Sequence, residues 1–215
     1  MTRSPTRQVA PPMKTYAILI DGGFIKRKLS RGPKAPMQAA DIQTFVDSVK
    51  SHELLNGLNL YRIYYYDSHP LKNSEKNPLS QEVLDFGSHP VVQYAEALFK
   101  GLSTIPFLAL RLGELSFNGW DLKPRLLRTP SQTLTINPDD LKPSITQKGV
   151  DMRIGMDMAA LSLKKQVDVI VLVTGDSDFV PAMKFVRREG INLFLATLGH
   201  RVKEPMIEHS DCLLN

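Results

Sequence analysis

Residues 167–174, VDVIVLVT, form an almost continuously apolar run that ends at the turn sequence GDSD of residues 175–178. Such a run without polar alternation is typical of a strand covered on both faces, as in a parallel sheet. Helical patterns precede it at 149–165 and follow it at 179–189, and a further strand is expected at 191–198. This alternation of strands and helices predicts a doubly wound α/β sheet.

The first part of the chain shows the same alternation. Residues 15–20, TYAILI, read as a short buried strand that stops at Asp21 and two glycines. Residues 59–66, NLYRIYYY, read as a second strand rich in β-favouring side chains. Apolar positions at helical spacing predict a helix at about 38–55 between them. Residues 1–13 are polar, basic and proline-containing, which predicts a disordered tail.

The middle of the chain carries weaker signals. A helix is predicted at 79–99, with a break near residues 88–90, and a strand at 107–115. The sequence FNGW at 117–120 indicates a turn that can start a hairpin. Residues 128–147 contain three prolines and many Ser, Thr, Gln and Asn, so a loop is predicted there.

Length and composition fit one globular domain. The chain has 215 residues, of which 42% are hydrophobic and 23% charged, enough to bury a core without crosslinks. We expect a single domain at 14–215 with an elaboration at about 68–147. The one cysteine, Cys212, excludes a disulfide framework and a cysteine-rich zinc site. Without a membrane-length apolar run or a secretory pattern, the protein is expected to be cytoplasmic and to have no membrane partner.

The net charge of +5 is concentrated at the start of the chain. Residues 1–34 hold eight bases and one acid, so the remaining 181 residues carry a net charge of −2. A basic entry segment suits a polyanion such as RNA or DNA. A solvated tail followed by an ordinary basic helix explains the same charges equally well.

Acidic side chains follow two of the predicted strands. Asp21 comes after the strand at 15–20, and Asp176 and Asp178 come after the strand at 167–174. The carboxyl ends of parallel strands form one edge of a sheet, where active crevices lie. If the two strands are neighbours, the three carboxylates converge, and their repulsion calls for a shared proton or a cation. Carboxylate oxygens suit Mg²⁺ or Mn²⁺.

The helix expected at 149–165 adds two acids. Asp151 lies in its first turn, where a carboxylate also suits the helix dipole. Asp157 falls on the apolar face of the helix, so it needs a cation or a hydrogen-bond donor at the sheet edge. Simpler interpretations exist for each acid alone, namely a cap or turn for Asp21 and Asp176, dipole stabilisation for Asp151, and a bond to Lys148, Arg153 or a backbone amide for Asp157. The combination favours a metal site.

The segments YAILIDGGF at 16–24 and KGVDMRIGMDMAALSLKKQVDVIVLVTGDSDFVPAMKFVRREGINLFLA at 148–196 together resemble the NYN family, most closely its LabA-like branch. The motifs KGVD and TGDSDF are specific as a pair. The resemblance covers about 14–67 and 105–210. It implies a PIN-like three-layer α/β/α sandwich with a mainly parallel central sheet.

The resemblance also implies a function, the hydrolysis of RNA by a Mg²⁺- or Mn²⁺-dependent endoribonuclease. One or two ions would be bound. Many members have Asn where this chain has Phe24, and this departure leaves open a non-catalytic RNA-binding or regulatory protein. The acids of the family's catalytic metal site fall on Asp21, Asp151, Asp176 and Asp178, and a further acidic position of the branch falls on Asp157.

Other residues are candidates for supporting roles. The hydroxyls of Thr174 and Ser177 can hydrogen-bond the carboxylates or a water molecule. Bases near the acids would hold RNA phosphates without reading sequence, and an exposed sheet edge would allow a homodimer. The bases that we expect to bind RNA are Lys26, Arg27 and Lys148 above all, together with Arg153.

Two other enzyme classes fit the sequence less well. A phosphatase of the haloacid-dehalogenase type needs a D-x-D motif after the first strand, where this chain has Asp21 followed by two glycines. A nucleotide-binding Rossmann protein needs a glycine-rich phosphate loop, and neither G-x-G-x-x-G nor G-K-[ST] is present.

Overall fold

The computed structural model describes residues 13–32, 35–128 and 133–214, so most of the predicted tail lies outside the described residues. A seven-stranded sheet in the order β6-β5-β2-β1-β7-β8-β9 forms its centre. Only β6 runs antiparallel to its neighbour. The strands are β1 (Thr15–Asp21), β2 (Asn59–His69), β5 (Leu108–Leu122), β6 (Leu141–Lys148), β7 (Val169–Val173), β8 (Asn192–Ala196) and β9 (Cys212–Leu214).

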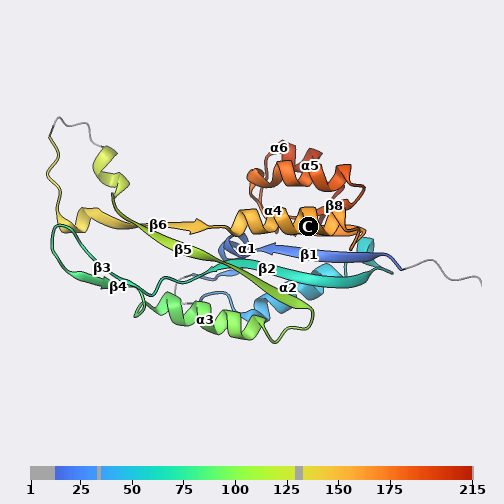
Figure 1. Cartoon of the computed structure of the whole chain (residues 1–215), viewed down its shortest axis with the longest axis horizontal. Helices are drawn as coiled ribbons and strands as arrows, with labels where there is room; N and C mark the ends of the chain where they lie inside the picture. The colour runs from blue at the N-terminus through green and yellow to red at the C-terminus, as the bar shows by residue number, and fades with distance from the viewer. Residues whose placement is uncertain (1–12, 33–34, 129–132, 215) are drawn as a thin grey trace, which may run out of the picture.

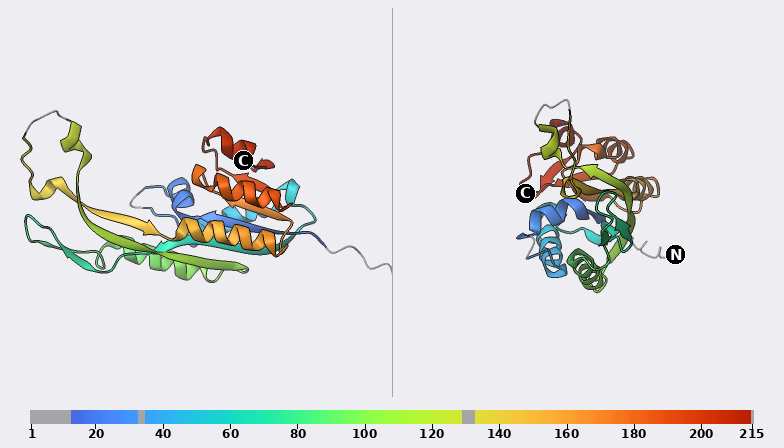
Figure 2. Two further views of the ribbon diagram at one scale, coloured as in Figure 1. Left: turned by 45° about the horizontal axis from the view of Figure 1, so that its top comes forward. Right: turned by 90° about the vertical axis from the view of Figure 1, so that its left-hand side faces the viewer.

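Helices cover both faces of this sheet (Figures 1 and 2). One face packs against α1 (Gly22–Leu29), α2 (Ala39–Lys50) and α3 (Pro90–Leu102). The other packs against α4 (Val150–Leu163), α5 (Val180–Arg188) and α6 (Glu204–Glu208). The described residues also form four short 3₁₀ helices: η1 (Glu53–Leu55), η2 (Pro124–Arg128), η3 (Pro138–Asp140) and η4 (Ser177–Phe179). The mainly parallel α/β/α arrangement predicted from the sequence is confirmed.

The apolar runs form strands whose two faces are both covered by helices. All five residues of β7 are buried. In β1, Ala17 and Leu19 pack toward α4 and α5, whereas Ile18 and Ile20 pack toward α1 and α2. Alternate side chains of one strand thus enter two separate cores, which is why these strands show no polar alternation.

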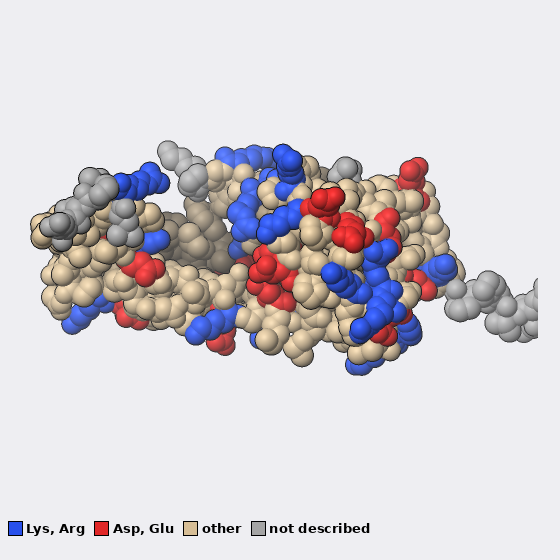
Figure 3. Space-filling view, turned by 90° about the horizontal axis from the view of Figure 1, so that it is seen from above, with Lys and Arg blue, Asp and Glu red and all other residues tan. Residues whose placement is uncertain are grey.

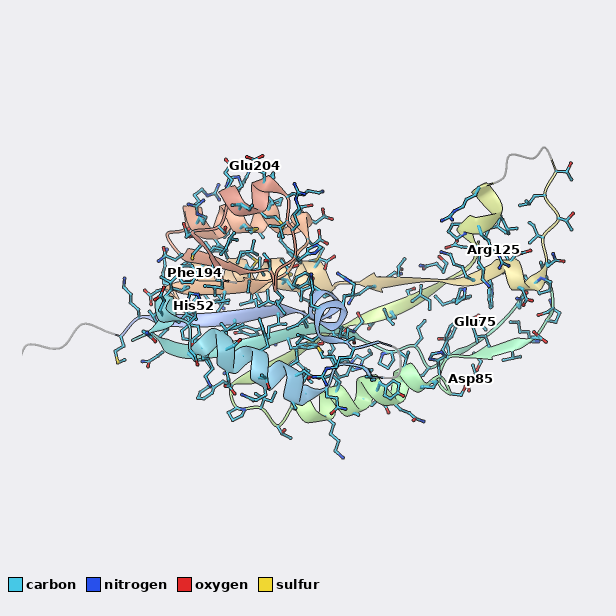
Figure 4. The ribbon with its side chains drawn as sticks, turned by 180° about the vertical axis from the view of Figure 1, so that it is seen from behind. His52, Glu75, Asp85, Arg125, Phe194 and Glu204 are labelled. Atoms are coloured by element: carbon cyan, nitrogen blue, oxygen red, sulfur yellow. The ribbon has the colours of Figure 1, made fainter. Side chains whose placement is uncertain are left out.

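Part of the chain extends beyond the helix-covered body as an arm (Figure 1). The arm consists of the distal halves of β5 and β6 and of the two-stranded sheet β3 (Ser74–Lys76) and β4 (Val83–Asp85). The Phe117 ring lies 5.9 Å from Phe86 and 6.0 Å from Trp120. The Arg125 guanidinium lies 2.7 Å from the Asp140 carboxylate. Figure 4 shows Arg125 and Glu75 on this arm, well away from Phe194 in the body.

Three predictions for the middle of the chain were wrong. The helix begins only at Pro90, which occupies its first turn after the His89 cap, and residues 83–85 are strand β4. Residues 117–120 are no hairpin turn, because β5 continues through them with an irregularity in its pairing. The predicted loop contains β6, whose mostly exposed side chains lack apolar alternation. Its Pro143 is tolerated because β6 is an edge strand.

Candidate functional site

Asp21 and Asp176 lie at the same edge of the sheet because β1 and β7 are neighbouring parallel strands. Asp21 ends β1 and caps α1, since its Oδ1 accepts a hydrogen bond from the Phe24 amide at 3.0 Å. The buried Thr174 hydroxyl donates to Asp21 Oδ2 at 3.0 Å. It also accepts from the Asp176 amide at 3.2 Å. Thr174 therefore joins the two acidic turns.

The turn after β7 presents one more acid and one hydroxyl. Asp176 caps η4 by accepting from the Asp178 amide at 2.9 Å. The Ser177 hydroxyl accepts from Lys203 Nζ at 3.0 Å rather than contacting a carboxylate. Asp178 itself is exposed. In the described part of the chain, its carboxylate has no hydrogen-bond or ion-pair partner.

Asp151 reaches this group of acids from α4. The helix begins directly after Gly149, whose φ of 78° is readily adopted only without a side chain. Partial burial raises the pKa of Asp151, and the negative charges of Asp21, Asp176 and Asp178 raise it further. Four carboxylates from three segments thus share one electrostatic environment.

The four acids are near one another without enclosing a single point. Among the described residues, no three His, Cys, Asp or Glu side chains are close enough to hold one metal ion. Two of the four, Asp21 and Asp176, are engaged as caps. The other two, Asp151 and Asp178, are exposed, and no described group pairs with them.

The raised pKa of Asp151 predicts a pH-dependent stability effect. When the pKa of a group is higher in the folded than in the unfolded protein, protonation of that group favours the folded state. This contribution to stability is fully present below the unfolded-state pKa and is lost as the pH rises through the folded-state pKa. At pH 7 the ionised carboxylate is therefore unfavourable, and because solvent screens this exposed group, Asp151→Asn should stabilise the metal-free protein by no more than about 0.5 kcal/mol. The gain should vanish near pH 3. Urea denaturation at both pH values measures it, and a variant less stable than wild type at pH 7 would contradict the prediction.

Asp157 serves to attach α4 to the sheet. Its Oδ2 accepts from the Tyr66 hydroxyl of β2 at 2.8 Å and from Arg111 Nε of β5 at 3.1 Å. The Arg111 guanidinium also lies 5.2 Å from the centre of the Tyr64 ring. The acid thus meets both a cation and a hydrogen-bond donor, as its place on an apolar helix face requires. Neither Lys148 nor Arg153 is its partner.

Loss of the hydroxyl bound to Asp157 should weaken the fold. Tyr66 is fully buried, and burial together with the Asp157 charge raises the pKa of its hydroxyl, which stays protonated as a donor. We expect Tyr66→Phe to lower the free energy of unfolding by about 1–2 kcal/mol. Tyr64→Phe is the matched control, because no described group hydrogen-bonds the Tyr64 hydroxyl; it should change stability by less than about 0.5 kcal/mol. Equal effects of the two variants in urea denaturation would argue against this role.

A fifth acid at the same edge was missed by the sequence reasoning. Asp67 lies near the end of β2, is 3% exposed, and has Lys26 Nζ 2.8 Å from both carboxylate oxygens. The Ser68 amide donates to it at 2.8 Å and the Tyr65 hydroxyl at 3.4 Å. Applying to β2 the rule used for β1 and β7, that acids follow strands, would have found it.

The four bases predicted to hold phosphate fall into two groups. Lys26 forms an ion pair with Asp67, and it also lines a pocket of about 730 Å³ between α1 and α3. Arg27, Lys148 and Arg153 are exposed, and the described residues offer none of them an ion-pair partner. Lys148 directly precedes the turn into α4, and Arg153 lies in the same helical segment as Asp151.

A comparison with protein families finds a match in the second part of the chain. A family model described as the NYN domain matches residues 125–211. The match includes Asp151, Asp157, Asp176 and Asp178, but it begins well after Asp21. No curated protein matches. The NYN family is PIN-like and generally nuclease-like.

The fold also has a counterpart among solved structures. It is similar to the crystal structure of a protein of unknown function from Vibrio parahaemolyticus, with a TM-score of 0.53 at 12% sequence identity. The likeness covers 96% of this chain and 95% of that one. At this identity it concerns the fold alone. None of the described helices is both long and apolar enough to cross a bilayer.

Proposed function

We propose that this protein is a metal-dependent endoribonuclease of the LabA-like NYN branch that hydrolyses RNA in the cytoplasm. The observation that carries the proposal is the placement of Asp21 and Asp176 at one sheet edge, joined through the Thr174 hydroxyl, with Asp151 and Asp178 near enough for the four charges to interact. Acids that repel one another at a sheet edge are unfavourable unless they serve a purpose. The NYN match over 125–211 gives independent support for nuclease chemistry.

The donor set suits a hard divalent cation. Asp21, Asp151, Asp176 and Asp178 would hold Mg²⁺ or Mn²⁺ through carboxylate oxygens. When bound, such an ion polarises the scissile phosphate and lowers the pKa of a water molecule. Thr174 fixes the orientation of Asp21 through its hydrogen bond, and the same hydroxyl fixes the backbone at Asp176.

The present spacing of the acids is compatible with this role. No three of them surround one point, but Asp151 and Asp178 are exposed and have no described partner. Rotation of exposed side chains between staggered conformations is fast and costs little. The exposed carboxylates of Asp151 and Asp178 can therefore rotate toward a bound ion.

A second candidate is a non-catalytic RNA-binding protein with the same fold. Two observations favour it: Asp21 and Asp176 already serve as caps, and Phe24 replaces the Asn of many NYN proteins. The Phe24 ring is 3% exposed and packs in the core, so it presents no polar group to the acids.

Cleavage of labelled single-stranded RNA separates the two candidates. The endoribonuclease should cut in Mn²⁺ or Mg²⁺ and lose this activity in EDTA. Internal cuts, shown by products of intermediate length, are expected. Folded protein that binds the RNA but leaves it intact with either metal would instead support the non-catalytic candidate.

A further inference from the structure

A basic pocket of about 550 Å³ lies beside the acidic turn after β7. Arg27 and Lys28 of α1 and His200 and Lys203 from the segment before α6 line it, next to Asp176. Figure 3 shows basic and acidic side chains side by side near the middle of the molecule, bordering the hollow between arm and body. The pocket is thus adjacent to the candidate metal ligands.

The charges of this basic pocket are not neutralised by the described residues. Three cationic side chains line it together with one acid, Asp176. No described carboxylate pairs with Arg27, Lys28 or Lys203, whereas the neighbouring Lys26 is paired with Asp67. Among the described residues, the Lys203 ammonium group hydrogen-bonds only the Ser177 hydroxyl, and Lys28 Nζ lies 5.9 Å from the centre of the Phe24 ring. Uncompensated positive charge in a concave site attracts an anion.

The wall of the pocket is firmly packed. The Phe24 and His200 rings meet edge to face, with their centres 5.8 Å apart. Both press on Gly175, where a Cβ would lie 2.6 Å from His200 Cδ2 and 2.7 Å from Phe24 Cε2. A glycine at this point lets three segments of the chain close together. The pocket is therefore held at a fixed place relative to the turn that carries Asp176 and Asp178.

The lining favours a phosphate over a nucleobase. Arg, Lys and protonated His side chains donate hydrogen bonds to phosphate oxygens. Of the two aromatic rings in the wall, Phe24 is 3% exposed, and His200, although exposed, is oriented edge to face against Phe24. Arg27 borders both this pocket and the pocket between α1 and α3.

We propose that the basic pocket binds a backbone phosphate of single-stranded RNA next to the phosphate positioned at the carboxylates. The proposal rests on the proposed function for its choice of polymer. It assigns Lys28 and Lys203 as phosphate-binding residues. Substitutions of Lys28 and Lys203 test the pocket most directly. Arg27 lines two pockets, and Lys26 is paired with Asp67.

The test is the binding of fluorescein-labelled single-stranded RNA in EDTA, followed by fluorescence anisotropy at several salt concentrations. Lys28→Ala/Lys203→Ala should raise the Kd about tenfold and reduce the slope of log K against log salt by about 0.7 for the lost phosphate contact. Lys28→Arg/Lys203→Arg should restore binding. The control Lys100→Ala/Lys164→Ala, which changes two exposed lysines near the carboxyl ends of α3 and α4, should bind like wild type.

The outcomes distinguish this inference from the proposed function. If the alanine variant and the control bind RNA equally, or if wild type binds no RNA, the phosphate site is overturned. Binding is measured in EDTA, so it does not depend on metal-dependent cleavage. If the alanine variant binds RNA more weakly in EDTA and the wild-type protein does not cleave RNA in Mn²⁺, the phosphate site is supported and the proposed nuclease activity is contradicted.

Discussion

Replacing Asp178 with Asn is expected to reduce metal-dependent RNA cleavage at least about 100-fold, because removing one charged metal ligand from such a site costs several kcal/mol of transition-state stabilisation. Stability should be unchanged or slightly higher. The carboxylate is exposed, no described group pairs with it, and the backbone amide of Asp178 keeps its bond to Asp176. Initial cleavage rates in saturating Mn²⁺ measure the first effect, and thermal unfolding the second.

Asp47→Asn is the matched control for this substitution. Asp47 is an exposed acid of α2 whose carboxylate, among the described residues, bonds only Gln43 and Lys50, so the same loss of one charge should leave cleavage within about twofold of wild type. Full activity of the Asp178 variant would remove this residue from the site. An unfolded Asp178 variant would show that the carboxylate has a structural role that the fold does not reveal.

The largest stability effect is expected at the pair formed by Lys26 and Asp67. Lys26→Met removes the ammonium group and leaves Asp67, 3% exposed, with only the Ser68 amide and a long contact from the Tyr65 hydroxyl. Breaking a buried ion pair costs about 3–5 kcal/mol. Because the Lys26 side chain is 42% exposed, solvent screening reduces this, and we expect a loss of about 2–3 kcal/mol. Urea denaturation measures it.

A double-mutant cycle isolates this interaction. Asp67→Asn in the Lys26→Met background should recover more than 1 kcal/mol, because the uncompensated buried charge is gone. Arg31→Met, which breaks the exposed pair with Asp41, is the control and should cost less than about 1 kcal/mol. Additive effects of Lys26→Met and Asp67→Asn would contradict the pairing. Any RNA-binding measurement on Lys26 variants must therefore be read beside their stability.

The sheet that positions the site could be predicted from the sequence because its signal is local. Val169 to Val173 are all buried, so their apolar character alone indicated a covered strand. The strand ends were equally clear, since Asp21 and Asp176 double as helix caps and turn formers. Once β1 and β7 are neighbours, the meeting of their acids follows from the topology.

The rest depended on contacts between distant segments. β6 is a polar edge strand whose backbone pairs with β5. The sequence of residues 141–148 does not predict that pairing. The pairing of Asp157 with Tyr66 and Arg111 joins residues 91 and 46 positions apart. Asp67 pairs with Lys26, which lies 41 positions away in the sequence. The expected homodimer stays a prediction.

Titration with Mn²⁺ at pH 7 tests most directly whether the four carboxylates act as one site. The account predicts that wild type binds one or two ions, that Asp151→Asn and Asp178→Asn each weaken binding about tenfold or more, and that Asp47→Asn binds like wild type. Isothermal titration calorimetry, or the loss of the electron paramagnetic resonance signal of free Mn²⁺, gives both the stoichiometry and the affinity of binding. Mn²⁺ affinity that is the same in wild type and all three variants would contradict the account.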